Sequence, residues 1–194
     1  MFLIQNIPCV ILAGGKSSRM GENKALLPFG KLNLISYEYQ KMCKIFQNVF
    51  ISCKKGILPE FEKNTLIEKD EIFSPLVGIR NAFLALKASK IFFLSVDTPF
   101  VKNETIHRIC SIEGSYDVIY PSLKGRSHYL ISLWNKSTLE ELQTALNGRE
   151  YKIGNLIDKL QTLAISLNDE EEFYNLNTPL DYQNAIKNLK DEDA

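Results

Sequence analysis

The most apolar run in the sequence is IFFLSV, residues 91–96. It is too short for most helices, and its aromatic and β-branched residues favour a strand. A strand without alternating polar positions is typical of a parallel sheet that helices cover on both faces. The run is followed directly by Asp97-Thr98-Pro99, which ends it. We therefore expect a buried strand with a carboxylate immediately after its last residue.

Segments of strand and helix type alternate on both sides of this run. Further strands are expected at residues 8–12, 49–51, 65–67, 118–120, 129–133 and 163–167. Helices are expected at residues 33–46, 76–88, 103–110, 137–146, 152–160 and 179–189. Alternation of this kind favours a three-layer α/β fold with a mostly parallel central sheet. No repeat, linker or change of composition divides the chain, so we expect residues 1–194 to form a single domain.

The composition favours a small substrate over a long nucleic acid. Hydrophobic residues make up 45% of the 194 residues and charged residues 24%, as in ordinary globular proteins. The 23 basic and 23 acidic residues give a formal net charge of zero. Proteins that bind long nucleic acids usually have a basic excess, because contacts to phosphates dominate their affinity. We expect no nucleic-acid partner.

The cysteines and the N-terminus favour a cytoplasmic protein. The cysteines, which have no CxxC or zinc-type spacing, are Cys9, Cys43, Cys53 and Cys110. We interpret them as small apolar residues in a reducing compartment. No apolar run reaches the roughly 20 residues that cross a bilayer, and residues 1–10 lack the features of a signal peptide. No membrane partner is expected.

A glycine-rich loop, LAGGKSSRMG, begins at the end of the first expected strand and covers residues 12–21. Ligands of open α/β sheets bind outside the carboxyl ends of the strands. Gly14 and Gly15 would let the backbone come close to a phosphate, which successive amide groups can cradle. Arg19 and Lys24 add positive charge at the same place. We predict a phosphate-binding loop; the alternative is a purely structural turn.

This loop matches neither of two common nucleotide-binding motifs. In a Walker A motif, the two glycines would be one residue closer than Gly15 and Gly21, and a lysine would replace Glu22. The GxGxxG pattern of dinucleotide-binding proteins is also missing. Both a P-loop ATPase and a dehydrogenase are therefore disfavoured.

Asp97 should lie at the same edge of the sheet as the loop, because both follow expected strands. Magnesium ions in proteins often have one or two carboxylate ligands together with substrate phosphates. We predict that Asp97 binds Mg²⁺; the alternative is a turn or capping role. Of the two histidines, His128 lies in a polar stretch and could contact a substrate, whereas His107 falls in an expected helix.

A third polar segment, NLNTP at residues 175–179, precedes the last expected helix. On an extended chain Asn175 and Asn177 point to the same side, where their amides could bind a polar heterocycle or a phosphate. The alternative for Asn177 and Thr178 is a cap on the helix that Pro179 begins.

Together these segments resemble the MobA-like molybdenum cofactor guanylyltransferases, a family of the wider nucleotidyltransferases. The longest match is residues 12–21 with Lys24, although Arg19-Met20-Gly21 also recurs in related cytidylyl- and sugar-nucleotidyltransferases. Further matches, in the family's order, are Pro75-Leu76-Val77-Gly78, Asp97-Thr98-Pro99 and residues 175–179.

The chain departs from the family pattern at two positions. Ser74 replaces the usual glycine, and Ser52 stands where some members have asparagine, so no contact is assigned to Ser52. The family's acidic residue after the third strand corresponds to Asp70 or Glu68, and Asp70 is preferred.

The resemblance implies a three-layer αβα Rossmann-like nucleotidyltransferase fold. It implies that GMP is transferred from GTP to molybdopterin that carries molybdenum, with release of pyrophosphate. The residues implied in GTP binding are Leu12, Ala13, Gly14, Gly15, Lys24, Asp70 and Asp97.

The remaining roles are also implied by the resemblance. Asp97, Lys24 and Arg19 would be catalytic, with Mg²⁺ on Asp97 as the cofactor. Asn175 and Asn177 would bind the molybdopterin. Molybdoenzymes or their chaperones are further implied partners.

Two alternatives stay open. The chain could be a cytidylyltransferase for molybdopterin or methylerythritol phosphate, or an enzyme for a sugar phosphate. It could also be a non-catalytic nucleotide-binding module on the same fold, although the presence of both Lys24 and Asp97 favours an enzyme.

Overall fold

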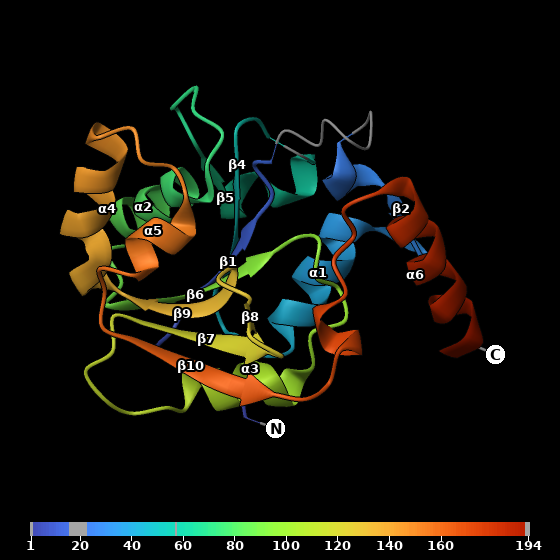
Figure 1. Ribbon diagram of the computed structural model, residues 1–194. Coiled ribbons are helices and arrows are strands. Elements are labelled where there is room, and N and C mark those ends of the chain that lie inside the picture. The colour runs from blue at the N-terminus through green and yellow to red at the C-terminus, as the bar shows by residue number, and fades with distance from the viewer. Residues whose placement is uncertain (1, 16–22, 57, 193–194) are drawn as a thin grey trace.

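The computed structural model describes residues 2–15, 23–56 and 58–192 (Figure 1). Its central sheet has the strand order β10-β7-β9-β6-β1-β4-β5, and β8 pairs with β7. The strands are β1 (Cys9–Leu12), β4 (Val49–Cys53), β5 (Thr65–Ile67), β6 (Lys90–Ser95), β7 (Val118–Leu123), β8 (Arg126–Ser127), β9 (Ile131–Asn135) and β10 (Thr162–Leu167). Strand β9 runs antiparallel to both β6 and β7, and β8 is antiparallel to β7. The other pairs are parallel, which confirms the mostly parallel sheet.

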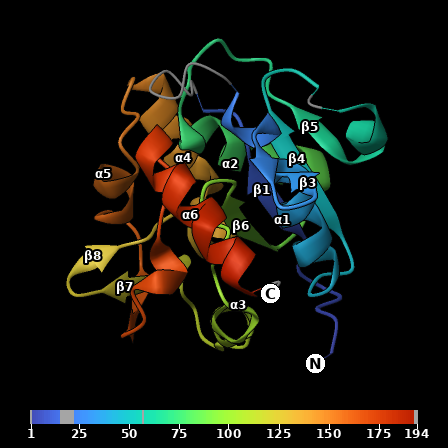
Figure 2. The ribbon, with the colours of Figure 1, turned by 90° about the vertical axis from the view of Figure 1, so that its right-hand side faces the viewer.

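Helices cover both faces of this sheet and confirm the three-layer fold. The α-helices are α1 (Leu34–Cys43), α2 (Pro75–Leu86), α3 (Asn103–Cys110), α4 (Leu139–Asn147), α5 (Ile153–Ile157) and α6 (Pro179–Glu192). One core cluster joins the sheet to α1, α3 and α6, and a second joins it to α2, α4 and α5. Figures 1 and 2 show α6 on the same side of the molecule as α1.

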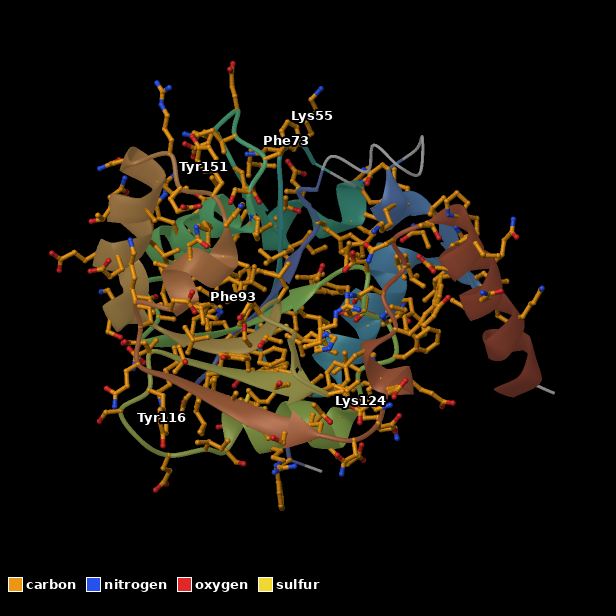
Figure 3. All side chains as sticks on the ribbon, in the orientation of Figure 1. Lys55, Phe73, Phe93, Tyr116, Lys124 and Tyr151 are labelled. Atoms are coloured by element: carbon orange, nitrogen blue, oxygen red, sulfur yellow. The ribbon has the colours of Figure 1, made fainter. Side chains whose placement is uncertain are left out.

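Strands β1 and β6 form the middle of the sheet and are buried on both faces. Phe92 and Leu94 belong to the core under α1 and α3, whereas Ile91 and Phe93 belong to the core under α2 and α4. Phe93 lies in the interior between sheet and helices in Figure 3. The unbroken apolar run therefore reflects a strand without a solvent face. Since β1 pairs in parallel with β6, the segments that follow the two strands emerge at one edge.

Short elements complete the fold. A two-stranded sheet joins β2 (Pro28–Phe29) to β3 (Leu32–Asn33). The 3-10 helices are η1 (Lys24–Leu26), η2 (Pro59–Asn64), η3 (Lys136–Thr138) and η4 (Glu171–Phe173). Among the helices that the structure describes, none has the length and apolar character needed to span a membrane.

The cysteines agree only in part with the interpretation as small apolar residues. All four are free thiols; Cys9 and Cys53 are buried and Cys110 is partly buried. Cys43 is exposed at the end of α1 and is the exception.

Candidate active site

Two neighbouring cavities open at the carboxyl ends of the central strands. The larger, which we call the main cavity, has a volume of about 620 Å³ and is lined by Leu12, Gly14, Gly15, Glu68, Glu71, Ile72, Phe73, Ser74, Pro75, Ser95, Asp97, Leu130 and Tyr151. The smaller, the side cavity, has about 290 Å³ and is lined by Ser95, Asp97, Thr98, Arg126, Ser127, His128, Tyr129, Leu130, Ile131, Ile153, Asn175 and Asn177. Both cavities share Ser95, Asp97 and Leu130. Asp97 is thus at their junction.

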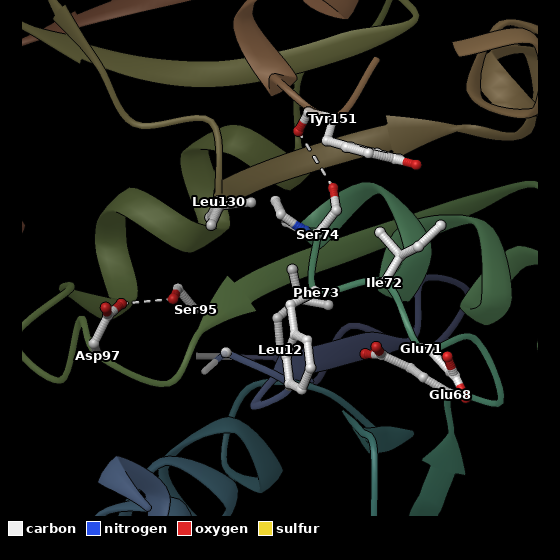
Figure 4. A pocket seen from close by; sticks show the side chains of 13 residues that line it. Leu12, Glu68, Glu71, Ile72, Phe73, Ser74, Ser95, Asp97, Leu130 and Tyr151 are labelled. Atoms are coloured by element: carbon white, nitrogen blue, oxygen red, sulfur yellow. Dashed lines mark hydrogen bonds between the residues drawn. The ribbon is translucent and has the colours of Figure 1, made fainter. Parts of the chain in front are cut away.

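The ends of the main cavity differ in their polar groups. Figure 4 shows Asp97 and Ser95 at one end and Glu68 and Glu71 at the other, with Phe73 and Leu12 between them. Ser74 caps α2 by accepting from the amide of Leu76 at 3.2 Å, and its hydroxyl donates to the Tyr151 carbonyl at 3.3 Å. The serine at position 74 is therefore used both to begin a helix and to join two walls of the cavity.

The Asp97 carboxylate is held by two side chains from different segments. Ser95 Oγ donates to Oδ1 at 2.5 Å, and Lys24 Nζ lies 3.0 Å from Oδ2. Lys24 Nζ also lies 3.5 Å from Oδ1 of Asn177. Lys24 begins η1, which Asn23 caps. The structure thus brings together Lys24, Asp97 and Asn177, although they come from three distant parts of the chain.

The NLNTP segment is fixed to the Asp97 turn through its backbone. The amide of Leu176 donates to the Asp97 carbonyl at 2.9 Å, and the Leu176 side chain is fully buried. With Leu176 anchored inward, Asn175 and Asn177 both line the side cavity. Thr178 instead has the capping role given as the alternative, since its hydroxyl accepts from the Asp181 amide at 3.2 Å.

The first part of the glycine-rich loop continues the sheet before it reaches the cavities. The Leu12 carbonyl accepts from the Val96 amide at 3.2 Å, and the Ala13 amide donates to the Ser52 carbonyl at 2.8 Å. Leu12, Ala13, Gly15 and Lys24 also line a small third cavity of about 100 Å³ against Asp97. Because its amide is already bonded, Ala13 has only its carbonyl left for a ligand. Arg19 and Gly21 lie outside the described residues.

Glu68, rather than Asp70, lies in the wall of the main cavity. Glu68 is buried, accepts from Ser52 Oγ at 2.8 Å and pairs with Lys54 Nζ at 3.1 Å. A Cβ atom on Gly14 or on Gly78 would lie 2.9 Å from Glu68 Oε1, so both glycines make room for this carboxylate. The structure therefore also explains why a serine fits at position 52.

The Asp70 carboxylate is turned to a different partner. It pairs with Arg80 Nη2 at 2.6 Å and is not among the residues that line either cavity. The preference for Asp70 over Glu68 in the sequence therefore has no geometric support. Both residues follow β5 within three positions, which is why the sequence did not separate them.

A buried carboxyl and a half-buried lysine lie on α1, and the lysine contacts the Asp97 turn. The Glu38 side chain is fully buried, and burial raises its pKa to about 8 from 4.5 despite the nearby charge of Lys41. Lys41 Nζ donates to the Pro99 carbonyl at 2.7 Å, and burial lowers the Lys41 pKa. Neither residue was singled out in the sequence, because a charged residue at these helix positions looks like one on an exposed face.

The donor set around Asp97 suits one kind of metal site. Within the described part of the chain, no three His, Cys, Asp or Glu side chains cluster as a metal-binding group. A lone carboxylate, with 21% of its side-chain surface exposed at a cavity junction, cannot enclose an ion alone. It fits an Mg²⁺ ion that takes its remaining ligands from substrate phosphates and water.

Known proteins resemble this chain over nearly its whole length. The family described as MobA-like NTP transferase domain matches residues 9–163. A molybdenum cofactor guanylyltransferase of Helicobacter pylori (strain P12) is 45% identical over 97% of this chain and 96% of that protein. A molybdenum cofactor guanylyltransferase of Campylobacter jejuni (strain RM1221) is 33% identical over 96% of this chain and 99% of that protein.

Solved structures share the fold at low sequence identity. The molybdopterin-guanine dinucleotide biosynthesis protein A of Archaeoglobus fulgidus superposes with a TM-score of 0.80 at 19% identity, over 95% of this chain and 100% of that one. The 2-C-methyl-D-erythritol 4-phosphate cytidylyltransferase of Thermus thermophilus gives 0.73 at 14% identity, over 95% and 99%. With Lys24, Asp97 and Asn177 gathered at one junction and relatives matched over nearly the whole chain, the chain belongs to the MobA-like nucleotidyltransferases.

Proposed function

We propose that this enzyme transfers GMP from GTP to molybdopterin that carries molybdenum, forming the guanine dinucleotide of the cofactor. The observation that supports it most is the position of Asp97 between two cavities, one lined by the glycine loop and the other by Asn175 and Asn177. Two substrates bound in adjacent cavities would meet at this carboxylate. Relatives that match nearly the whole chain are named molybdenum cofactor guanylyltransferases.

In the proposed reaction the terminal phosphate of the acceptor attacks the α-phosphorus of GTP. A new P–O bond forms, the bond to the β-phosphate oxygen breaks, and pyrophosphate leaves. Both reactants are anions, so the protein contributes mainly by positioning them and neutralising their charge. No covalent intermediate on the protein is required.

The residues of the junction have distinct roles in this proposal. The backbone at Gly14 and Gly15, with Arg19 and Lys24, would hold the phosphates and the departing pyrophosphate. Lys24 is well placed because its ammonium group is already at the junction, 3.0 Å from Asp97. Asp97 would hold Mg²⁺, which when bound supplies positive charge to the phosphate oxygens.

The far end of the main cavity would receive the base. Guanine has N–H donors on its Watson–Crick edge, and a carboxylate can accept hydrogen bonds from them. Glu68 and Glu71 provide carboxylates in the cavity wall there, together with the half-exposed ring of Phe73. We therefore propose the Glu68 end for the guanine and give Asp70 the supporting role of holding Arg80. Leu12, which lines the main cavity, and Ala13, which lines the small third cavity, would contribute backbone groups.

A pyrophosphate-release assay with a panel of nucleotides tests the proposal. Purified protein, Mg²⁺ and molybdenum-loaded molybdopterin are mixed in turn with GTP, CTP, UTP or ATP. We expect release with GTP that depends on the acceptor. Release with CTP instead would indicate a cytidylyltransferase, an activity that occurs on this fold. GTP binding without any release would indicate a non-catalytic module.

We also propose that molybdoenzymes or their chaperones contact this enzyme to receive its product. The support is that the side cavity opens at the protein surface beside the exposed Arg126, so that a bound product would be accessible there. Co-purification of the product-loaded enzyme with a molybdoenzyme or its chaperone would support this proposal, and its failure at micromolar concentrations would weaken it.

A further inference from the structure

His128 is fixed in the side-cavity wall by the hairpin that carries it. Strands β7 and β8 are joined by Lys124 and Gly125, both with positive φ angles of 49° and 79°, as in a tight two-residue turn. The amide of His128 donates to the Pro121 carbonyl at 2.9 Å, and its carbonyl accepts from Ile131 at 3.1 Å. The hairpin therefore fixes the backbone from which the imidazole projects.

The imidazole is buried and has an unsatisfied nitrogen. His128 is 7% exposed, and its ring lies against that of Phe173 with a centroid distance of 4.5 Å and an angle of 35°. Its Nε2 atom is buried without a hydrogen-bond partner among the described residues. Buried polar atoms are nearly always paired in native proteins, so an unpaired one calls for a partner from outside the chain.

The surroundings of His128 indicate what kind of partner fits. The other polar side chains of the side cavity are amides, hydroxyls, the Arg126 guanidinium and, at the junction, the Asp97 carboxylate. Burial and the nearby charge of Arg126 lower the His128 pKa, which keeps the ring neutral near pH 7. A neutral imidazole suits a neutral polar heterocycle better than a phosphate, which the cationic Arg126 would attract.

We propose that His128 is a specificity-determining residue that binds the polar heterocycle of the acceptor through Nε2. The inference rests on the proposed function, because it assigns the side cavity to the acceptor. His128 lines the side cavity and would present Nε2 to a heterocycle bound there. His128 and the amides of Asn175 and Asn177 would then contact one heterocycle, while its phosphate lies toward Asp97.

Two substitutions separate this role from a structural one. His128→Phe keeps an aromatic ring against Phe173 but has no nitrogen. His128→Gln lacks the ring but can return an amide nitrogen near the position of Nε2. His107→Phe on α3, outside both cavities, serves as the matched control for a histidine-to-phenylalanine change. Melting temperatures establish that each variant is folded.

The readout is binding of molybdenum-loaded molybdopterin, followed by calorimetry, alongside GTP binding and pyrophosphate release. We expect His128→Phe to weaken acceptor binding about tenfold, as for the loss of one well-formed hydrogen bond. Its GTP affinity and melting temperature should stay as in the wild type. His128→Gln should recover at least part of the acceptor affinity, and His107→Phe should match the wild type.

The outcomes distinguish this inference from the proposed function. Unchanged acceptor affinity in His128→Phe, in an otherwise active enzyme, would overturn the role of His128 alone. Equal losses of GTP and acceptor binding with a lower melting temperature would assign His128 a structural role and also overturn it. A wild-type protein that binds the acceptor but releases no pyrophosphate would refute the proposed function and leave the binding test of His128 decisive. A wild-type protein that does not bind the acceptor would refute both.

Discussion

The Nζ atom of Lys24 lies 3.0 Å from Oδ2 of Asp97, although 73 residues separate the two in the chain. This pair joins the segment after β1 to the turn after β6, and the 3.5 Å distance from Lys24 to Asn177 extends the contact to the C-terminal segment. One lysine from the segment after β1 thus contacts both the Asp97 carboxylate and the Asn177 amide. When a triphosphate binds, the ammonium group would exchange Asp97 for phosphate oxygens.

Substitution of Asp97 by Asn should abolish transfer without unfolding the protein. The variant keeps the size of the side chain but loses the charge that would hold Mg²⁺, so we expect a fall in kcat of about 10²-fold or more. The partly exposed pair with Lys24 contributes about 1 kcal/mol or less to stability, so the melting temperature should change little. Asp158→Asn, at an exposed position after α5, is the control. Near-normal turnover at saturating Mg²⁺ would remove Asp97 from the mechanism.

Substitution of Lys24 by Ala should weaken GTP binding by about tenfold or more, as for loss of a hydrogen bond to a charged group. Calorimetry with GTP measures the effect directly. Lys136→Ala removes an exposed lysine from η3, away from both cavities, and should bind GTP as the wild type does. An unchanged GTP affinity in Lys24→Ala would argue against a phosphate contact.

The buried Glu38 should make stability fall as the pH rises. Its carboxyl ionises near pH 8 in the folded protein but near pH 4.5 when unfolded. Between these values the unfolded chain has lost this proton and the folded protein has not, so rising pH favours unfolding and the effect levels off above pH 8. Glu38→Gln lacks this titration. A shift of one pKa unit corresponds to about 1.4 kcal/mol. The free energy of unfolding of Glu38→Gln, relative to that of the wild type, should therefore rise by up to about 4 kcal/mol between pH 5 and pH 8.

Urea unfolding of both proteins at the two pH values checks this expectation. The comparison between them cancels the titration of groups that they share. An equal difference in unfolding free energy at pH 5 and pH 8 would mean that Glu38 ionises normally in the folded protein.

Substitution of Gly78 by Ala should destabilise the fold. An added Cβ would lie 2.9 Å from both Glu68 Oε1 and Leu12 Cδ2, and Glu68 is tied to Ser52 and Lys54. Overpacking of this kind costs about 1–3 kcal/mol, from which the gain in helix propensity of about 1 kcal/mol is subtracted. Gly56→Ala, where an added Cβ meets nothing within 4 Å, is the control. Equal stability of wild type and Gly78→Ala would show that the Glu68 and Leu12 side chains move away from the added Cβ atom at no cost.

Much of the fold could be predicted because the strongest signals are long and local. The bounds of β5 and α3 agree with the expected ranges, and β1 and β6 differ from theirs by a residue. The two-residue strands β2, β3 and β8 were not predicted, because so short a segment has no periodicity to detect. The antiparallel direction of β9 could also not be predicted from the sequence, because an apolar run has the same pattern in a parallel and in an antiparallel strand.

One topological rule predicted that Asp97 and the glycine loop would meet, but it did not predict the other walls of the two cavities. Asp97 and the glycine loop meet because the carboxyl ends of neighbouring parallel strands lie side by side. The walls formed by Phe73, Tyr151 and Arg126 come from loops and a hairpin whose positions depend on tertiary packing. The choice between Glu68 and Asp70 depended on which carboxylate faces inward, which only the contacts with Lys54 and Arg80 reveal.

The most direct test of the central claim is to follow the α-phosphate of labelled GTP in the presence of Mg²⁺ and molybdenum-loaded molybdopterin. We expect the label to move onto the acceptor in an amount equal to the pyrophosphate released, and Asp97→Asn to show neither. Label that stays on GTP, or that moves only when labelled CTP replaces GTP, would contradict guanylyl transfer by this protein.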